Sequence, residues 1–141
     1  MNVATILKQK GRVVFTTTTD KSLLDIARLL AQHGIGCIVI EEDDGKVAGI
    51  VSERDLMRAI SQVGIKVLEE PVSDFMTKIV VTAREADTIN RLMSEMTARR
   101  FRHMPVVERD RLVGLVSVGD LVKIQIAEIE MEAAATREYT A

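Results

Sequence analysis

Several residue types that common functional sites require are scarce in this chain of 141 residues. Its single cysteine, Cys37, excludes an intramolecular disulfide and a cysteine-rich zinc site. Its two histidines, His33 and His103, could hold a metal ion only with carboxylate partners, and their spacing identifies none. Neither a Walker loop nor a glycine-rich dinucleotide fingerprint between a strand and a helix is present. The sequence therefore favours neither a metal centre nor a recognisable catalytic centre.

Long apolar runs and an excess of basic residues are also missing. Residues 1–12 contain no uninterrupted apolar core long enough for a signal peptide, and no stretch approaches the roughly 20 apolar residues of a membrane span. The chain has 19 Lys and Arg against 21 Asp and Glu, whereas a protein that binds duplex nucleic acid normally has a basic face. With 47% apolar and 28% charged residues, we expect a soluble, cytoplasmic globular protein that binds neither membranes nor duplex nucleic acid.

What the chain does contain is an internal repeat. Each copy begins with a short apolar stretch that ends in Thr, and apolar residues then recur at i, i+3, i+4 and i+7, as on the buried face of a helix. Two further apolar runs follow, joined by a polar turn typical of a hairpin. The matched segments are 14–16 and 80–82, 37–40 and 103–106, and 49–55 and 114–120.

This order predicts an α/β (α+β) protein made of two tandem βαββα repeats. Two copies are too few for a solenoid, so we expect them to pack against each other with pseudo-twofold symmetry. We assign residues 1–68 to the first repeat and residues 69–141 to the second repeat with a longer C-terminal helix. Residues 1–11 and the linker at 71–77 have similar patterns, and we expect them to play the same part for the two copies.

The predicted C-terminal helix has an apolar stripe. Val122, Ile126, Ile129 and Ala133 step by four, three and four residues, close to the spacing of a coiled-coil seam. This stripe offers a packing face for a second subunit.

Two matched Ser-x-x-Asp segments are the main candidate site. In each, a hydroxyl follows a strand, at Ser52 or Ser117, and an aspartate follows three residues later, at Asp55 or Asp120. One interpretation is a helix capping box, a common structural device. The other is a ligand site, because the free N–H groups and the dipole at a helix N-terminus suit a phosphate or a ribose. The spacing leaves both interpretations open.

The repeated Gly-apolar-x-Ser-x-x-Asp pattern resembles the CBS (cystathionine-β-synthase) domain. Met76-Thr77 at the end of the linker and residues 102–107, Arg-His-Met-Pro-Val-Val, match the same family. Tandem pairs of this domain form Bateman modules, so the resemblance implies a small stand-alone protein of the bacterial type with two clefts between its copies. It also implies a homodimer and a regulatory adenosine ligand (AMP, ADP, ATP, NAD(H) or S-adenosylmethionine), with no catalytic cofactor.

The resemblance assigns roles to paired positions of the two copies. The motif aspartate accepts hydrogen bonds from the ribose, the motif serine contacts phosphate or ribose, and the threonine at the end of the first strand lies near the base or ribose. These pairs are Asp55 and Asp120, Ser52 and Ser117, and Thr16 and Thr82. Cys37, Met104 and Pro105, in the neighbouring apolar runs, also belong to the predicted nucleotide-binding set.

The two copies differ in charge at one place. Arg102 and His103 stand where the first copy has Gly36 and Cys37, and the planar fork of arginine suits phosphate oxygens. Arg54, beside the first motif aspartate, is a further phosphate candidate. The alternatives are ordinary solvated charges for the arginines and a hydrogen-bonded structural side chain for His103. The neighbouring Arg100 we expect to be solvated.

Three functions fit these observations unequally. The leading hypothesis is a non-catalytic regulatory module in which an adenosine ligand orders the cleft and a partner protein senses the change. The alternative is a ligand-independent scaffold that dimerises and regulates a partner, with the Ser-x-x-Asp segments serving only as caps. A nucleotide hydrolase is the third, and the sequence offers no base–nucleophile pair for it.

Overall fold

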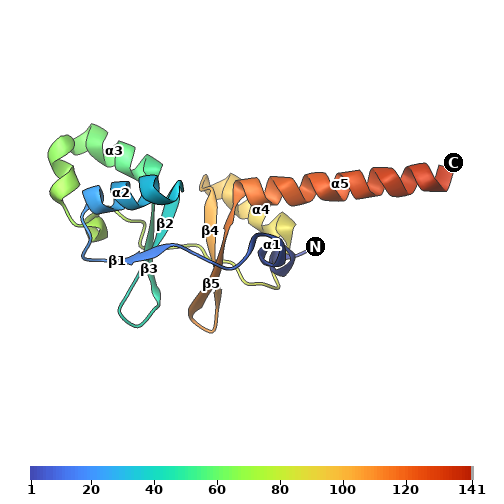
Figure 1. Ribbon diagram of the computed structural model, residues 1–141, viewed down its shortest axis with the longest axis horizontal. Helices are drawn as coiled ribbons and strands as arrows, with labels where there is room; N and C mark the ends of the chain where they lie inside the picture. The colour runs from blue at the N-terminus through green and yellow to red at the C-terminus, as the bar shows by residue number, and fades with distance from the viewer. Residues whose placement is uncertain (141) are drawn as a thin grey trace.

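The computed structural model describes residues 1–140, and the side chains of residues 1–138. Its first copy contains a three-stranded sheet in the order β1-β2-β3, with β1 parallel to β2 and β2 antiparallel to β3. The helices α2 and α3 lie together on one side of this sheet (Figure 1). The elements are β1 (Thr16–Thr18), α2 (Leu23–His33), β2 (Cys37–Glu41), β3 (Val47–Ser52) and α3 (Glu53–Val63).

The second copy repeats this arrangement with one strand fewer. Its elements are α4 (Ile89–Arg99), β4 (His103–Glu108), β5 (Arg111–Ser117) and α5 (Val118–Thr140), and β4 pairs antiparallel with β5. The two copies form a mixed α+β pair related by a pseudo-twofold axis, with their sheets side by side (Figure 1). The predicted C-terminal helix is present as α5, which projects beyond the body of the molecule (Figure 1). Within the described residues, none of the helices is both long and apolar enough to cross a membrane.

The strand predicted at residues 80–82 does not form. A single parallel bridge joins Ala83 to Val106, in which the Ala83 N–H donates to the Pro105 carbonyl at 2.9 Å and the Val107 N–H donates to the Ala83 carbonyl at 2.9 Å. In a parallel ladder, the next bond toward the N-terminus would run from residue 105 to the carbonyl of Val81. Pro105 has no N–H, so this bond cannot form and the ladder stops after one bridge.

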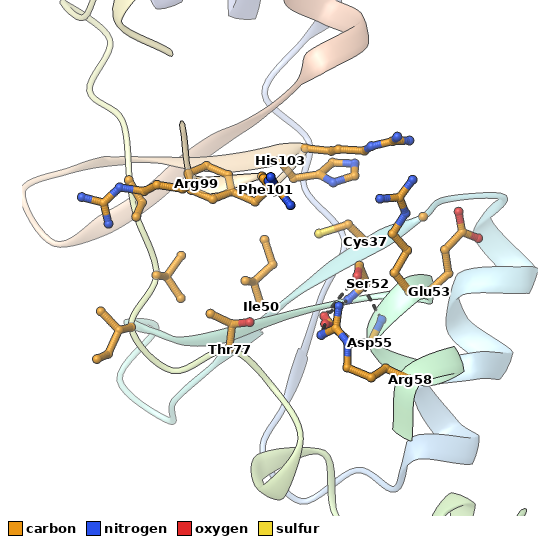
Figure 2. A pocket seen from close by; sticks show the side chains of 17 residues that line it. Cys37, Ile50, Ser52, Glu53, Asp55, Arg58, Thr77, Arg99, Phe101 and His103 are labelled. Atoms are coloured by element: carbon orange, nitrogen blue, oxygen red, sulfur yellow. Dashed lines mark hydrogen bonds and ion pairs between the residues drawn. The ribbon is translucent and has the colours of Figure 1, made fainter. Parts of the chain in front are cut away.

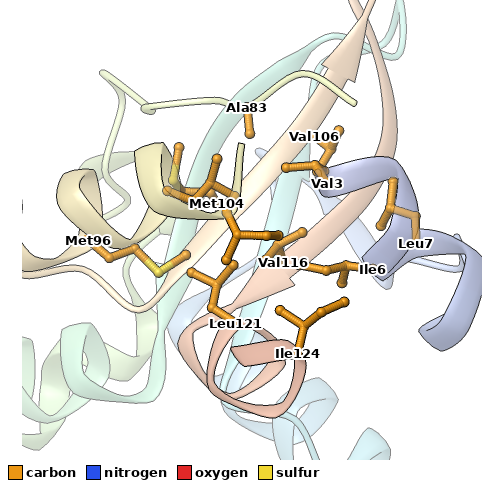
Figure 3. Packing of buried hydrophobic residues seen from close by; sticks show 12 residues of the cluster. Val3, Ile6, Leu7, Ala83, Met96, Met104, Val106, Val116, Leu121 and Ile124 are labelled. Atoms are coloured by element: carbon orange, nitrogen blue, oxygen red, sulfur yellow. The ribbon is translucent and has the colours of Figure 1, made fainter. Parts of the chain in front are cut away.

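Each copy has its own apolar core, and each core contains a segment that precedes the other copy in the sequence. The helix α1 (Val3–Lys10) precedes the first copy, but its buried residues pack in the core of the second with Met104, Val116 and Leu121 (Figure 3). Conversely, η2 (Val72–Asp74) precedes the second copy, and its Val72 packs in the core of the first. The division of the chain at residue 68 stays a prediction about sequence units.

Two glycines allow these segments to cross closely over the sheets. A Cβ atom at Gly49 in β3 would lie 2.5 Å from the Met76 sulfur and 2.8 Å from the Thr77 carbonyl oxygen. A Cβ atom at Gly114 in β5 would lie 2.6 Å from a methyl carbon of Leu7. Any side chain at either position would push the crossing segment away from the sheet.

Candidate functional site

A cleft of about 540 Å³ lies between the two copies; we call it the first cleft (Figure 2). The first copy contributes the end of β3 and the start of α3, and the second contributes residues 79–81 and residues 99–103. Phe101 lies on one side, opposite Ile50 and Thr77, with Ser52 and Asp55 at the α3 end (Figure 2). The cleft therefore combines an apolar wall with a polar helix N-terminus.

The Ser-x-x-Asp segment at this cleft is a capping box, as one interpretation of the sequence predicts. The Asp55 N–H donates to Ser52 Oγ at 3.3 Å, and Asp55 Oδ2 accepts from the Ser52 N–H at 2.8 Å. The other carboxylate oxygen, Oδ1, lies 3.3 Å from the Arg58 guanidinium. A carboxylate has room for further hydrogen bonds at each oxygen. The capping role is thus compatible with contact to a ligand in the cleft.

Six of the twelve predicted site residues line the first cleft. They are Cys37, Ser52, Arg54, Asp55, Arg102 and His103. The structure adds residues that sequence reasoning did not assign, among them Arg58, Arg99, Arg100 and Phe101. Arg100 also lines the cleft, and its side chain is exposed there, which is compatible with the solvated charge that we expected. The arginine-rich run at residues 99–102 was the sequence signal that could have predicted these lining residues.

The thiol and imidazole in the cleft are both uncharged at neutral pH. Burial, and to a smaller extent the charge of Asp55, raise the pKa of the Cys37 thiol to about 12, so it is protonated and inert as a nucleophile. Burial lowers the pKa of His103, and the neighbouring Lys10 lowers it further, while Asp120 and Glu53 oppose this shift without cancelling it. The positive charge expected of the Arg102–His103 pair therefore comes from the arginine alone.

The second Ser-x-x-Asp segment, which we call the second cap, forms the same hydrogen bonds but lies in a different environment. Asp120 Oδ2 accepts from the Ser117 N–H at 2.8 Å, and it also forms an ion pair with Lys10 Nζ at 2.7 Å. Lys10 Nζ additionally donates to the Leu115 carbonyl at 2.9 Å. Burial raises the pKa of Asp120, but the bonds from Lys10 and Ser117 outweigh it, and the pKa lies below its ordinary value. Lys10 of α1 thus already forms an ion pair with the Asp120 carboxylate.

The remaining predicted residues lie outside the lining of the first cleft. Thr16 is exposed on β1, and Thr82 is half-buried just before the Ala83 bridge. Met104 is fully buried in the second core, and Pro105 is buried beside it in β4. Their contact with a nucleotide stays a prediction, as it does for Ser117. Among the residues that the structure describes, no group of three or more His, Cys, Asp or Glu could hold a metal ion.

The repeat itself is found in other proteins. The family model of the CBS domain matches residues 11–62 and again residues 72–127. This chain belongs to the CBS-domain family. A crystal structure of a CBS-domain containing protein from Agrobacterium tumefaciens is 44% identical, with a TM-score of 0.86, and the match covers 88% of this chain and 92% of that one. The resemblance predicted from the sequence is confirmed.

Two further CBS-domain relatives are informative. A mitochondrial CBS domain-containing protein of Arabidopsis thaliana is 31% identical over 89% of this chain and 65% of its own length. The chain spans 64 to 66% of the length of the first curated relatives it matches. The CBS domain pair of protein MJ0100 was solved in complex with 5'-methylthioadenosine and S-adenosyl-L-methionine. It is 25% identical, with a TM-score of 0.81, and the match covers 91% of this chain and 98% of that one.

Proposed function

We propose that this CBS-domain pair is a non-catalytic regulatory module that binds an adenosine nucleotide in the first cleft. The observation that carries the proposal is the first cleft itself, which places an apolar wall, a carboxylate and several guanidinium groups around one cavity. The domain pair of protein MJ0100, which shares the fold and binds two adenosine compounds, supports the choice of ligand class. A location in the cytoplasm and a regulated partner protein stay predictions from the sequence.

The parts of such a ligand match the parts of the first cleft. Ile50 and Phe101 face each other across the cavity and offer apolar contact to both faces of a purine (Figure 2). The Asp55 carboxylate is in reach of the ribose hydroxyls, which can donate hydrogen bonds to it. The N-terminus of α3 and the arginines then face the phosphates.

A thermal-shift panel with AMP, ADP, ATP, NAD, NADH and S-adenosylmethionine tests the proposal. A ligand at 100 times its dissociation constant adds about 2.7 kcal/mol of apparent stability, which a melting curve resolves easily. We expect Asp55→Ala to remove the shift and Asp120→Ala, the matched variant in the second cap, to retain it. If no adenosine compound raises the melting temperature of the wild type, the proposal is wrong.

One observation favours the scaffold function as a second candidate. The apolar stripe of α5 is exposed where α5 leaves the second core, with Ile126 at 50% and Ile129 at 64% exposure. We propose that a second copy of this chain covers the stripe and forms the predicted homodimer. An antiparallel pair of α5 helices brings Ile126 opposite the partner's Ile129 and Lys123 beside the partner's Glu130. Apolar side chains then pack on each other, and opposite charges lie side by side.

Light scattering coupled to size-exclusion chromatography tests this pairing. We expect a dimer for the wild type and a monomer for Ile126→Glu, because the substitution buries an unpaired charge in the seam. Ala127→Glu adds the same charge beside the stripe and is expected to leave the dimer intact. A monomeric wild type would contradict the homodimer.

A further inference from the structure

The first cleft has a strong local surplus of positive charge in a protein whose overall charge is −2. Five arginines line it, and its only lining carboxylates, within the described residues, are Glu53 and Asp55. His103 does not add to the surplus, because burial lowers its pKa. Like charges gathered in one cavity repel one another, so this arrangement stabilises a bound anion and not the empty protein.

Two of the five arginines already have carboxylate partners. Arg58 lies 3.3 Å from Asp55, and Arg99 lies 2.9 Å from Glu95, one turn earlier on α4. The other three, Arg54, Arg100 and Arg102, have no carboxylate within 4.0 Å among the side chains that the structure describes. Arg54 comes from the first copy and the other two from the second. The unpaired guanidinium groups therefore reach the cavity from both of its sides.

The backbone at Arg100 adds an independent observation. Arg100 ends α4 in the left-handed region, at φ 60° and ψ 36°, where a side chain is strained. The equivalent residue of the first copy, Gly34, has nearly the same backbone angles, φ 63° and ψ 38°, without that strain. The chain thus carries an arginine at the edge of the cleft in a position where glycine is the stable choice.

The matching positions of the first copy carry no such charge. Arg99, Arg100 and Arg102 correspond to His33, Gly34 and Gly36 in the repeat. His33 is stacked on Phe15, with ring centroids 3.9 Å apart. We call Arg99, Arg100 and Arg102 the cationic wall. This wall belongs to the first cleft and not to the fold that both copies share.

From this wall we infer that the first cleft selects adenosine nucleotides with two or more linked phosphates over AMP, adenosine and S-adenosylmethionine. The inference rests on the proposed function. A terminal phosphate carries about −1.5 to −2 charges at neutral pH, and each additional phosphate supplies further anionic oxygens to guanidinium groups on opposite walls. Adenosine has no anionic group to pair with these guanidinium groups, and S-adenosylmethionine brings a sulfonium cation into a positive cavity.

Isothermal titration calorimetry with adenosine, AMP, ADP, ATP and S-adenosylmethionine tests the selection. We expect ADP and ATP to bind about tenfold or more tightly than AMP and adenosine, since one additional charge-assisted pair is enough for that factor. In the double variant Arg100→Gly/Arg102→Gln this advantage is expected to disappear while adenosine binds as before. The variant is expected to fold, because Arg100→Gly relieves backbone strain.

Arg109→Gly is the matched control. Arg109 is also an arginine in the left-handed region, at φ 50°, but it lies exposed in the turn between β4 and β5. Its replacement removes the same charge and is expected to leave the preference unchanged. Equal binding of AMP and ADP to the wild type would overturn the selection while leaving the proposed function intact. The absence of binding by every compound would overturn both.

Discussion

Gly49→Ala offers a sharp test of how closely the linker at residues 71–77 crosses β3. The added methyl group would lie 2.5 Å from the Met76 sulfur, which can move, and 2.8 Å from the Thr77 carbonyl oxygen, which is backbone. That backbone is fixed by two hydrogen bonds to Ile50, the Thr77 N–H donating at 2.9 Å and the Thr77 carbonyl accepting at 3.0 Å. Relief of the overlap must therefore lengthen at least one of these bonds.

Forcing one extra methyl group into a packed site typically costs 1–3 kcal/mol, and a weakened hydrogen bond costs about 1 kcal/mol. Alanine also reduces the entropy of the unfolded chain, which returns about 0.4–1 kcal/mol. We expect Gly49→Ala to lower the free energy of unfolding by about 1–3 kcal/mol, measured by urea denaturation with an unchanged m-value. Because Thr77 lines the first cleft, nucleotide affinity is expected to fall as well.

Gly119→Ala is the matched control for this substitution. Its Cβ atom would meet only Ser117 Oγ, at 3.6 Å, and it lies in the first turn of α5. Alanine favours a helix over glycine by up to about 1 kcal/mol, so we expect this variant to be as stable as the wild type or more so. If Gly49→Ala unfolds at the same urea concentration as Gly119→Ala, the close crossing of the linker over β3 is wrong.

Three further predictions follow from the ion pair, the thiol and the second core. Asp120 has a lowered pKa, so its pairing stabilises the fold above its ordinary pKa of 3.8 and this contribution is lost as the pH falls through the lower folded value. Lys10→Met is expected to reduce stability at pH 7 by about 0.5–1 kcal/mol and to match the wild type in acid, as denaturation at both pH values would show. Cys37, with a pKa raised to about 12, is expected to resist iodoacetamide at pH 8 until urea unfolds the chain; labelling of the folded protein would contradict its burial. Leu7→Ala is expected to cost about 2–5 kcal/mol in chemical denaturation because it opens a cavity in the second core, whereas Lys8→Ala on the exposed face of α1 is expected to change little.

Features that depend on neighbours in sequence could be predicted. The caps at Ser52–Asp55 and Ser117–Asp120 join residues three positions apart, so the sequence pattern could offer the capping box as one of its two interpretations. The helices could be predicted from the spacing of apolar residues, because that spacing also involves residues close to one another in the sequence. The strand predicted at residues 80–82 was wrong because the next ladder bond beyond the Ala83 bridge needs an N–H at residue 105, and Pro105 has none. The sequence pattern does not show that this proline faces the Val81 carbonyl.

Features that depend on the packing of distant segments could not be predicted. Lys10 and Asp120 are 110 residues apart, and only the docking of α1 on the second copy brings them together. Arg58 and Arg99 lie on helix faces whose direction toward the first cleft depends on how the copies pack. The number of arginines can be read from the sequence, but the sequence does not show which of them line the same cavity.

The exchange of segments between the two cores also affects how the chain can fold. During synthesis α1 emerges well before β5 and α5, against which Leu7 and Ile6 pack. An isolated helix of eight residues is not stable in water, so α1 remains unstructured until the second copy has been made. Contacts between segments so far apart slow folding. The first copy can therefore begin to fold on the ribosome, whereas the second must wait for its own helix α5 and for the docking of α1, which was synthesised before the first copy.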